Sequence, residues 1–422
     1  MTNYNTLSKE IYTTKRSILH FSSKLGENLQ KPNQKFLMDM LFGLAKRKSV
    51  LLSDIALALE ETIDPIQTIK RLSTRLEEFH EGEQLLTNYG ELIKPYLNEE
   101  DNLIIVDNSE IIKPNSNKME ALGQVRDGST GKIEKGYWTT NMIAVGKKTK
   151  HPIPVYSHLY SSKEEDFISA NEETSKGFRH VQQLLGEKKA TFVMDRDYDN
   201  VGVMKEIVGQ KNDFIIRLKK NRHLLYQNKK LSVRDLALRR KGKINFRSEI
   251  KGNVYDLKVS HITVELPSFK EQKMTMLVVY GYGKDPMVVL TNKRVQKKDE
   301  VLSILKAYIM RWRIEEMFRV QKLEFGLEGI RVRTLKRLNH LFFFVSAMIT
   351  FMTLKIEKKN VFFHMIIDRA RGIKSKDNIK MFLYRFSAGM KSILEKDTQG
   401  IHHFKYIEKA HNPRQLEFKL AL

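Results

Sequence analysis

The chain has 422 residues, 41% of them hydrophobic and 29% charged, which is enough to bury substantial cores in two to four domains. Lysine and arginine number 74 against 50 acids, and the net charge of +24 favours binding to polyanions, although a ribosome-associated or merely basic protein has a similar balance. The absence of cysteine excludes disulfides and thiolate metal sites and fits a cytoplasmic location.

Residues 1–98 are predicted to form a helical region. Ser53 is placed to cap one short helix, and Asp64 followed by Pro65 is a start signal for a second. The second helix is predicted to bury one side and expose a basic one, with Ile66, Ile69, Leu72 and Leu76 opposite Lys70, Arg71, Thr74 and Arg75. Two short helices joined by a tight turn fit a helix-turn-helix and also an ordinary helical hairpin.

Residues 99–218 are predicted to begin an α/β domain in which two apolar strands end in an aspartate. Asp107 follows the apolar run 103–106, and Asp195 follows 191–194. Such runs are typical of strands buried on both faces, and an acid directly after one lies at the sheet edge where α/β proteins build sites. A carboxylate in that place can instead begin a loop or cap a helix.

The residues after Asp195 favour a role other than capping for it. Asp197 and Asp199 are better placed to cap the helix predicted from Asn200, which leaves Asp195 without a structural role. Around these acids the pattern predicts three successive strands and then alternating helices and strands, with elements at 139–145, 153–160, 173–185, 190–195, 200–208 and 213–218. This order suggests a mixed sheet of the ribonuclease-H-like type.

Residues 219–284 are predicted to be a β-rich basic insertion. From 217 to 247 twelve residues are Lys or Arg and one, Asp235, is acidic. Strand patterns follow over 254–266 and 274–282. Basic side chains interleaved with aromatic ones suit a groove for DNA, and a solvated basic loop is the alternative.

Residues 285–345 are predicted to complete the sheet and to add a long helix. On that helix Tyr308, Arg311, Glu315 and Lys322 fall within an arc of about 60° at about 100° per residue. An adjacent apolar stripe would bury the helix against a core. Taken alone, the pattern also describes a solvated face with one charge pair, but the two strand-end aspartates favour a site.

Residues 346–422 are predicted to be helical and basic, with a polar tail at the end. The most apolar run of the chain, 341–354, is too short for a membrane span, and the N-terminal segment does not have a signal-peptide pattern. We therefore expect a buried helix in this run and no membrane association.

Asp107, Asp195 and Glu315 together offer three hard oxygen ligands, the type that holds Mg²⁺ or Mn²⁺. Three carboxylates repel one another, and divalent cations would relieve that repulsion. Two ions about 3.5–4 Å apart can activate a water or a 3′-hydroxyl and stabilise the leaving oxygen at phosphorus. With Arg311 and Lys322 holding phosphates, the residues predict metal-assisted cleavage or transfer of a phosphodiester.

The stretch from Tyr308 to Lys322 resembles DDE transposases of bacterial insertion sequences, specifically insertion-sequence family four. It matches that family's Tyr-x2-Arg-x3-Glu-x6-Lys signature at every defined position. The segments that begin at Asp107 and Asp195 look like the family's first- and second-aspartate segments, so the resemblance covers roughly residues 100–345.

The resemblance implies a ribonuclease-H-like core with an insertion, between a helical N-terminal region that binds DNA ends and a helical C-terminal region. It implies metal ligands at Asp107, Asp195 and Glu315, and phosphate contacts at Tyr308, Arg311 and Lys322. The implied activity is cut-and-paste transposition, in which two Mg²⁺ ions (or Mn²⁺) support cleavage at terminal inverted repeats and strand transfer into target DNA. A homodimer would act on two ends, in the bacterial cytoplasm and at the nucleoid when bound to DNA.

Two other functions fit the residues: an endonuclease of the same fold without strand transfer, and a transposase-derived DNA-binding regulator. The regulator would be expected to have lost acids that are present here. Some relatives stack a tryptophan of the insertion on a flipped base while the DNA end forms a hairpin. Trp138 and Trp312 lie outside the insertion, and Tyr280 or Tyr282 could stack instead.

Overall fold

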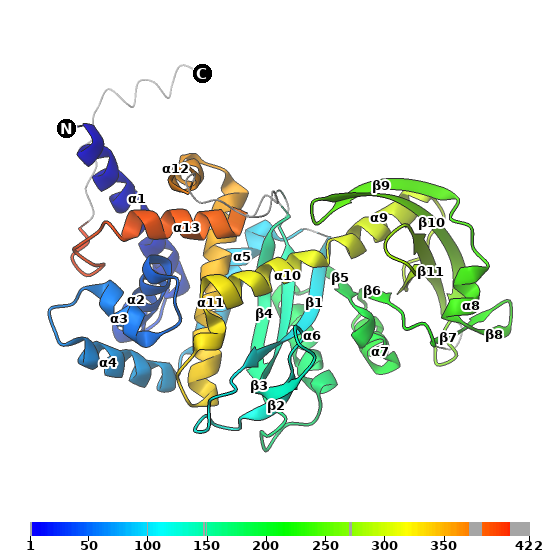
Figure 1. Ribbon diagram of the computed structural model, residues 1–422, viewed down its shortest axis with the longest axis horizontal. Helices are drawn as coiled ribbons and strands as arrows, with labels where there is room; N and C mark the ends of the chain where they lie inside the picture. The colour runs from blue at the N-terminus through cyan, green and yellow to red at the C-terminus, as the bar shows by residue number, and fades with distance from the viewer. Residues whose placement is uncertain are drawn as a thin grey trace.

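The computed structural model describes residues 2–98, 100–146, 148, 150–269, 272–370 and 382–405. They form a mixed α/β protein, as predicted, with three parts that follow one another along its longest axis (Figure 1). Helices from both ends of the chain lie at one end, a sheet covered by helices lies in the middle, and a β-rich part lies at the other end.

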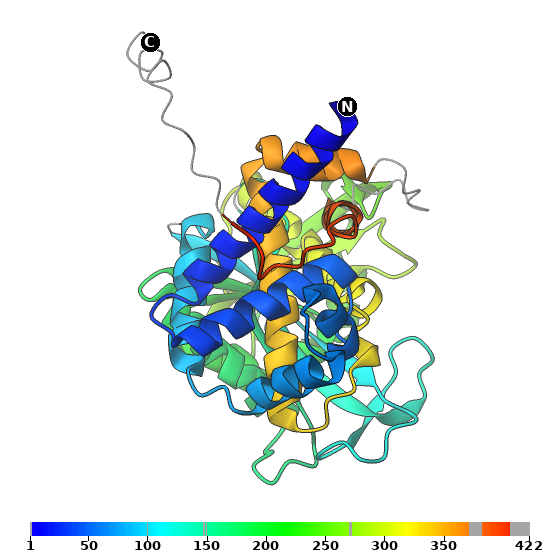
Figure 2. The ribbon, with the colours of Figure 1, turned by 90° about the vertical axis from the view of Figure 1, so that its left-hand side faces the viewer.

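The N-terminal part is helical, as predicted. Its elements are α1 (Thr2–Leu25), α2 (Lys31–Arg47), α3 (Leu52–Leu59), α4 (Pro65–Glu77), α5 (Gly82–Ile93) and the 3-10 turn η1 (Lys94–Tyr96). These helices pack on the long helix α11 (Leu335–Lys358), which stands between them and the sheet (Figure 2). Aromatic side chains join the layers, since Phe36 and Phe21 each lie 5.3 Å, between ring centroids, from a phenylalanine of α11.

The start of α4 follows the prediction. Asp64 accepts a hydrogen bond from the backbone N–H of Ile66 at 2.8 Å, and Pro65 opens the helix. Two details of this region were wrong: Ser53 lies inside α3, whose N-cap is Leu51, and Ile66 is 57% exposed. Ile66 stays outside because α4 is anchored further along, where Arg337 and His340 of α11 bond to the carbonyls of Ser73 and Leu76.

Ion pairs use part of the predicted basic face of α4. Arg71 donates to Asp39 at 2.7 Å and to Glu61 at 2.8 Å. His402, in the turn after the last helix, lies 3.1 Å from Asp39 and 3.2 Å from Glu61. Because Arg71 already pairs with both carboxylates, this cluster is a salt-bridge network that ties α4 to the C-terminal turn. The helix-turn-helix role of α3 and α4 stays a prediction.

The described strands form one sheet in the order β2-β3-β1-β5-β6-β12-β11-β10-β7-β8, with β4 beside β3 and β9 beside β10. Their bounds are β1 (Asp101–Ile112), β2 (Gly123–Arg126), β3 (Ile133–Val145), β4 (Pro152–Tyr160), β5 (Lys189–Met194), β6 (Asp213–Arg217), β7 (His223–Tyr226), β8 (Lys229–Ser232), β9 (Ile244–Ile250), β10 (Asn253–Glu265), β11 (Lys273–Tyr280) and β12 (Met287–Thr291). Strands β4, β3 and β1 are antiparallel, while β5 and β6 run parallel to β1.

Two helices make the parallel connections: α6 (Ala170–Leu185) joins β4 to β5, and α7 (Val201–Gly209) follows β5 and the 3-10 turn η2 (Arg196–Tyr198). The order β4-β3-β1-β5-β6, an antiparallel meander followed by two parallel strands, fits the predicted ribonuclease-H-like core. Helix α11 covers β4 on one side. An 18-residue window of α11 reaches a mean hydropathy of 1.4, high enough for a membrane span, but 78% of it is buried inside the protein. The prediction of a buried helix over 341–354 is confirmed.

Side chains from the neighbouring helices protect the edge strand β4. They occupy its outward backbone groups: Thr353 donates to the carbonyl of Pro152, Tyr89 to that of Pro154, and Asn339 bonds with both the N–H and the carbonyl of Leu159. An uncovered edge is a template for further strand pairing. Helices α5 and α11 therefore close the sheet at this side.

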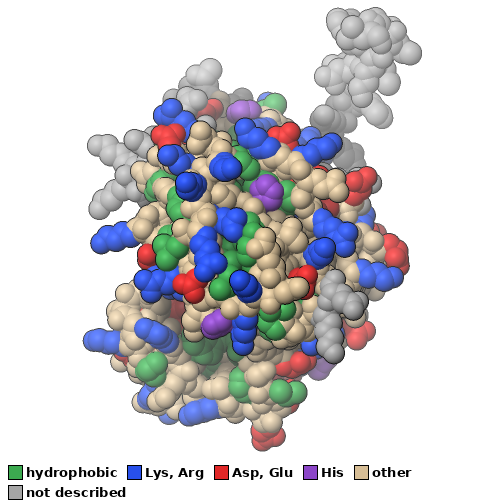
Figure 3. All heavy atoms as spheres, turned by 90° about the vertical axis from the view of Figure 1, so that its right-hand side faces the viewer, with side chains coloured by type: hydrophobic (Ala, Val, Ile, Leu, Met, Phe, Trp, Pro, Cys, Tyr) green, Lys and Arg blue, Asp and Glu red, His purple; other side chains and the backbone are tan. Residues whose placement is uncertain are grey.

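Between β6 and β12 the chain is β-rich, as predicted, and contains β7 to β11 and the short helix α8 (Val233–Leu238). These strands extend the central sheet, because β12 pairs with both β6 and β11. Figure 3 shows Lys and Arg side chains spread over this end of the molecule. Most cations of 217–247 are exposed: Lys219, Lys220, Lys229, Lys230, Arg234, Arg239, Lys241, Lys243 and Arg247. That the β-rich part is an inserted domain stays a prediction, as do the other predicted domain boundaries.

The predicted long helix with Tyr308, Arg311, Glu315 and Lys322 is not one regular helix. It consists of α9 (Lys298–Ile309), α10 (Trp312–Arg319) and the π-helical turn η3 (Val320–Glu324). At the junction the N–H of Arg311 bonds to the carbonyl of Tyr308 at 3.0 Å, a tighter i→i+3 bond. The N–H groups of Arg313 and Ile314 also bond to the carbonyls three residues before them, so the winding is tighter over this junction and looser in η3, and a uniform 100° per residue does not hold over the whole stretch.

The described chain beyond 345 is largely helical, as predicted, and continues in turns after Leu394. After α11 come α12 (Val361–Arg369) and α13 (Phe382–Leu394), and the short turn η4 (Leu327–Gly329) precedes α11. Helix α13 packs on α1 and α2, so both ends of the chain share one layer (Figure 2). The predicted polar tail lies outside the described residues.

Candidate active site

The sequence predicted Asp107 at the end of a strand. It lies instead within β1. The strand continues to Ile112 because β3 pairs with it that far. Its parallel neighbour β5 pairs with β1 only up to Ile105. Asp107 therefore stands just beyond the carboxyl end of β5, and the sheet edge predicted from the aspartate is created by the shorter neighbouring strand.

Asp195 follows β5 directly, at the same edge of the sheet. Its Oδ1 accepts a hydrogen bond from the backbone N–H of Asp197 at 2.7 Å, which caps the turn η2. The prediction that Asp195 has no structural role was therefore wrong. Neither Asp197 nor Asp199 is the N-cap of α7, because Asn200 takes that position and accepts from the N–H of Gly202 at 2.7 Å.

Arg311 joins Asp107 of the sheet to Glu315 of α10. Its Nη1 donates to Oδ2 of Asp107 at 2.8 Å, and its Nη2 donates to Oε1 of Glu315 at 2.9 Å. Asp195 is close enough to shift the pKa of both Asp107 and Arg311. The structure thus gathers four of the six predicted site residues, which come from three separate stretches of the chain.

Burial and like charge make the fully ionised cluster unfavourable. Burial raises the pKa of Asp107 to about 7, and repulsion from Asp195 and Glu315 acts in the same direction while Arg311 opposes it. The pKa of Asp195 is raised as well, chiefly by burial. Burial lowers the pKa of Arg311, but the surrounding acids raise it by more, so its net shift is upward. The cluster is therefore an environment that stabilises cations.

The other two predicted residues lie beside the cluster. Tyr308 is only 6% exposed, and its side chain is hydrogen-bonded with Arg217, so the phenol lies beneath the site. Lys322 donates to Glu110 at 2.8 Å and lies 3.4 Å from Glu328. Because Glu110 is on β1, three positions after Asp107, Lys322 flanks the carboxylates without entering the cluster.

The β-rich part contributes Lys251 and Tyr282 to the site. Sequence analysis named Tyr282 as a possible stacking residue and missed Lys251. Lys251 forms an ion pair with Glu315. Both Lys251 and Tyr282 line a cavity of about 90 Å³ together with Arg217, Trp312 and other residues of α9 and α10. The density of cations in this segment signalled that some of them meet acids. Lys251 lies in the turn of the hairpin formed by β9 and β10. Only the position of this hairpin determines that Lys251 is the cation that meets Glu315.

Glu316, the residue after Glu315 on α10, faces away from the cluster. It is buried, lies 2.9 Å from Arg313 and 3.6 Å from His151, and makes these contacts on the side of α10 opposite to Arg311. The geometry thus favours Glu315 over Glu316 as a site residue.

The donor set of the cluster fits a divalent cation. Asp107, Asp195 and Glu315 offer hard carboxylate oxygens, and a positively charged group already bridges two of them. Within the described residues the three do not form a set with ligand atoms all within 4.8 Å of one another. The guanidinium of Arg311 takes up the space between Asp107 and Glu315.

Residues 157–352 match the family described as "Transposase DDE domain". The chain carries a DDE transposase domain. The match contains Asp195, Glu315 and Lys322 and begins after β1, which holds Asp107. The protein is therefore an enzyme of the DDE transposase type, and domains of this family use divalent metal ions, which the carboxylate cluster suits.

Two solved structures are similar to this transposase at low sequence identity. The cryo-EM structure of the piggyBac transposase synaptic complex with hairpin DNA is 9% identical, with a TM-score of 0.46, and the match covers 99% of this chain and 84% of that chain. The crystal structure of the NurA nuclease from Sulfolobus solfataricus is 12% identical, with a TM-score of 0.25 and coverage of 71% and 99%. Both TM-scores are too low to add to the assignment. No curated protein matches the chain.

Proposed function

We propose that this transposase moves a bacterial insertion sequence by cut-and-paste transposition, and that it is of the family-four type indicated by its Tyr-Arg-Glu-Lys signature. The observation that carries the proposal is the bridge from Asp107 through Arg311 to Glu315 at the sheet edge where Asp195 also lies. Acids from distant stretches of the sequence converge there around a cationic group. The reaction is cleavage at terminal inverted repeats, followed by attack of the freed 3′-hydroxyl on target DNA.

Asp107, Asp195 and Glu315 are the proposed ligands of two Mg²⁺ ions, with Mn²⁺ as a substitute. Bound ions of this kind activate the attacking oxygen and stabilise the leaving oxygen at phosphorus. The chain supplies rigid positions, since β1 and β5 fix the two aspartates and α10 fixes the glutamate. Arg311, which neutralises two of these acids here, has the planar fork that binds a phosphate through two hydrogen bonds.

Arg311 and Lys322 are the proposed contacts to phosphates at the transposon end, and Tyr308 is proposed to support them. Lys322 and Arg311 have exposed fractions of 22% each, and each pairs with an acid of β1. Tyr308 is buried and acts from below, through its position beside Arg311. The exposed cations of the β-rich part extend this positive surface.

Tyr282 is the proposed stacking residue for an extrahelical base, in preference to Tyr280. The ring of Tyr282 lines the cavity at Glu315 and packs edge-on against Tyr255, with ring centroids 5.1 Å apart. The hydroxyl of Tyr280 donates to the carbonyls of Ala237 and Arg240, which holds that ring inside the β-rich part.

We further propose that two copies of the chain pair two transposon ends, each acting on the end bound by its partner, and that residues 1–98 bind the ends. The protein would act in the bacterial cytoplasm, at the nucleoid when bound to DNA. The net charge of +24 supports binding to DNA, since it favours rapid capture of a polyanion.

A joining assay with a pre-cleaved end tests the proposal. Purified protein, an end duplex with a free 3′-hydroxyl, supercoiled target and Mg²⁺ should give covalently joined product. Cleavage of an intact end without any joining would instead identify an endonuclease of the same fold. Binding to ends with neither cleavage nor joining would identify a DNA-binding regulator.

Replacement of Lys322 tests the phosphate contacts. Lys322→Ala is expected to weaken end binding by a factor on the order of ten and to reduce the slope of log affinity against log salt by about one. The measurement is fluorescence anisotropy with an end duplex at several salt concentrations. Lys176→Ala is the matched control, because Lys176 pairs with Glu173 at 2.7 Å on α6, away from the cluster. An unchanged salt slope in Lys322→Ala would contradict the contact.

A further inference from the structure

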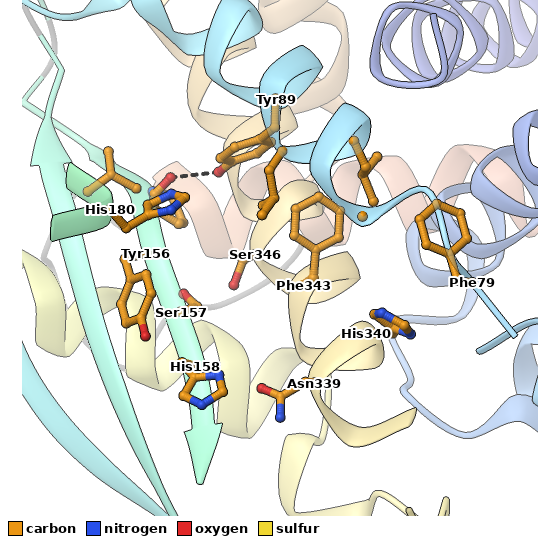
Figure 4. A pocket seen from close by; sticks show the side chains of 15 residues that line it. Phe79, Tyr89, Tyr156, Ser157, His158, His180, Asn339, His340, Phe343 and Ser346 are labelled. Atoms are coloured by element: carbon orange, nitrogen blue, oxygen red, sulfur yellow. Dashed lines mark hydrogen bonds between the residues drawn. The ribbon is translucent and has the colours of Figure 1, made fainter. Parts of the chain in front are cut away.

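A cavity of about 240 Å³ lies where the N-terminal helices meet the sheet, away from the carboxylate cluster. Its walls come from three places: α5 and the segment before it, the edge strand β4, and α11, with His180 added from α6 (Figure 4). Phe79, Tyr89, Tyr156 and Phe343 supply aromatic rings to the wall. The residues that carry the transposase chemistry do not line it.

Two hydroxyl groups in this cavity lack a hydrogen-bond partner among the described residues. They belong to Ser346 of α11 and Ser157 of β4, and both oxygens are buried. Ser346 is 96% buried as a residue, since its exposed fraction is 4%. Figure 4 shows both side chains beside the open space between β4 and α11. Buried hydroxyls without partners are costly, so the cavity offers two polar atoms that a ligand can satisfy.

The cavity carries no formal charge, in a chain with a net charge of +24. Its lining, as the structure describes it, holds no Lys, Arg, Asp or Glu. Burial lowers the pKa of His158, His180 and His340 below the ordinary value, so these imidazoles are neutral at neutral pH. A charged ligand, DNA included, would lose its hydration without gaining an ion pair.

Size and shape narrow the ligand further. A cavity of about 150 Å³ lined by apolar side chains holds one benzene molecule. In proportion, this cavity holds a ligand of about nine or ten non-hydrogen atoms, which is the size of a fused bicyclic aromatic ring. Ring walls favour such a flat partner through offset or edge-to-face contacts.

We propose that this cavity is a binding site for a small neutral bicyclic heteroaromatic compound, held between the aromatic rings of α5, β4 and α11 and hydrogen-bonded to Ser346 and Ser157. A ligand there touches the N-terminal helices and the catalytic sheet at once. Its binding therefore stabilises their contact. The site is independent of the transposition proposed above.

Indole is the probe, because it is neutral and bicyclic and has one N–H donor. It is expected to bind the full chain with a dissociation constant on the order of 0.1 mM, measured by saturation-transfer NMR, and to raise the melting temperature. Ser346→Ala is expected to weaken indole binding several-fold and to leave the binding of naphthalene, which has no donor, unchanged. This difference distinguishes a hydrogen bond from a general loss of packing.

Leu86→Trp blocks the opening of the cavity, since Leu86 lines it and is 44% exposed. It should reduce indole binding at least tenfold. Leu57→Trp is the matched control, because Leu57 is a 49% exposed leucine on the N-terminal helix α3 outside the cavity. Absence of indole binding at millimolar concentration would overturn the proposal and indicate a cavity filled by water. Equal binding by wild type, Leu86→Trp and Ser346→Ala would also overturn it, because indole would then bind elsewhere on the protein. Activity of the ligand-bound protein is not needed for any of these measurements.

Discussion

Asp107→Asn, Asp195→Asn and Glu315→Gln are each expected to reduce cleavage of a transposon end by about 10³-fold or more. Each change removes a negatively charged ligand, and metal stabilisation of the reacting oxygens amounts to several kcal/mol, where about 1.4 kcal/mol corresponds to tenfold in rate. End binding should persist, because phosphate contacts supply most of the affinity for DNA. Cleavage of a labelled end duplex in Mg²⁺ and a gel-shift assay measure the two properties.

Glu316→Gln is the control for this series. Glu316 is the next residue on α10, but it contacts Arg313 and His151 and not the cluster. Its replacement should leave cleavage within about tenfold of wild type once the melting temperature shows that the variant is folded. Wild-type cleavage by any one of the three triad variants would remove that residue from the site.

Arg311→Met is expected to destabilise the metal-free protein and to increase its response to Mn²⁺. Without the guanidinium, Asp107 and Glu315 lose their shared partner while Asp195 continues to repel Asp107. Removal of one partner of a buried ion pair costs about 3–5 kcal/mol. Arg311 and Glu315 are partly exposed, so we expect roughly 2 kcal/mol, a melting temperature lower by a few degrees. Mn²⁺ should restore most of this loss, because the ion replaces the missing positive charge.

Differential scanning fluorimetry with and without Mn²⁺ measures this effect, and Arg313→Met is the control. Arg313 pairs with the buried carboxylate of Glu316 at 2.9 Å, in the same helix, and is 17% exposed. Its loss should lower the melting temperature without a larger Mn²⁺ response, since Glu316 does not face the cluster. Equal Mn²⁺ responses in Arg311→Met and Arg313→Met would show that Arg311 does not occupy the place of a metal ion.

The local elements of this protein follow from the spacing of apolar residues. Strands such as β5 and β12 are short continuous apolar runs, and Asp64 and Pro65 mark the start of α4. These strands and this helix start can therefore be predicted from residues that are close in sequence. The order of three strands followed by alternating helices and strands predicted the mixed sheet. The predictions were wrong where contacts between residues distant in sequence determined the structure. Asp107 lies inside β1 because β3 pairs with β1 as far as Ile112, whereas β5 pairs with it only as far as Ile105. That difference depends on pairing between strands that are distant in sequence.

The sequence by itself determined the three acids, the signature residues around Glu315 and the basic character of the chain, because these depend only on residue type and spacing. Tertiary structure alone decided that Arg311 bridges Asp107 and Glu315, that Lys251 reaches Glu315, and that Tyr308 is buried. The prediction that the signature residues share one helix face assumes uniform winding. The break between α9 and α10 means that this assumption does not hold. Contacts between a hairpin turn and a helix depend on how whole elements pack, and no local pattern in the chain encodes that.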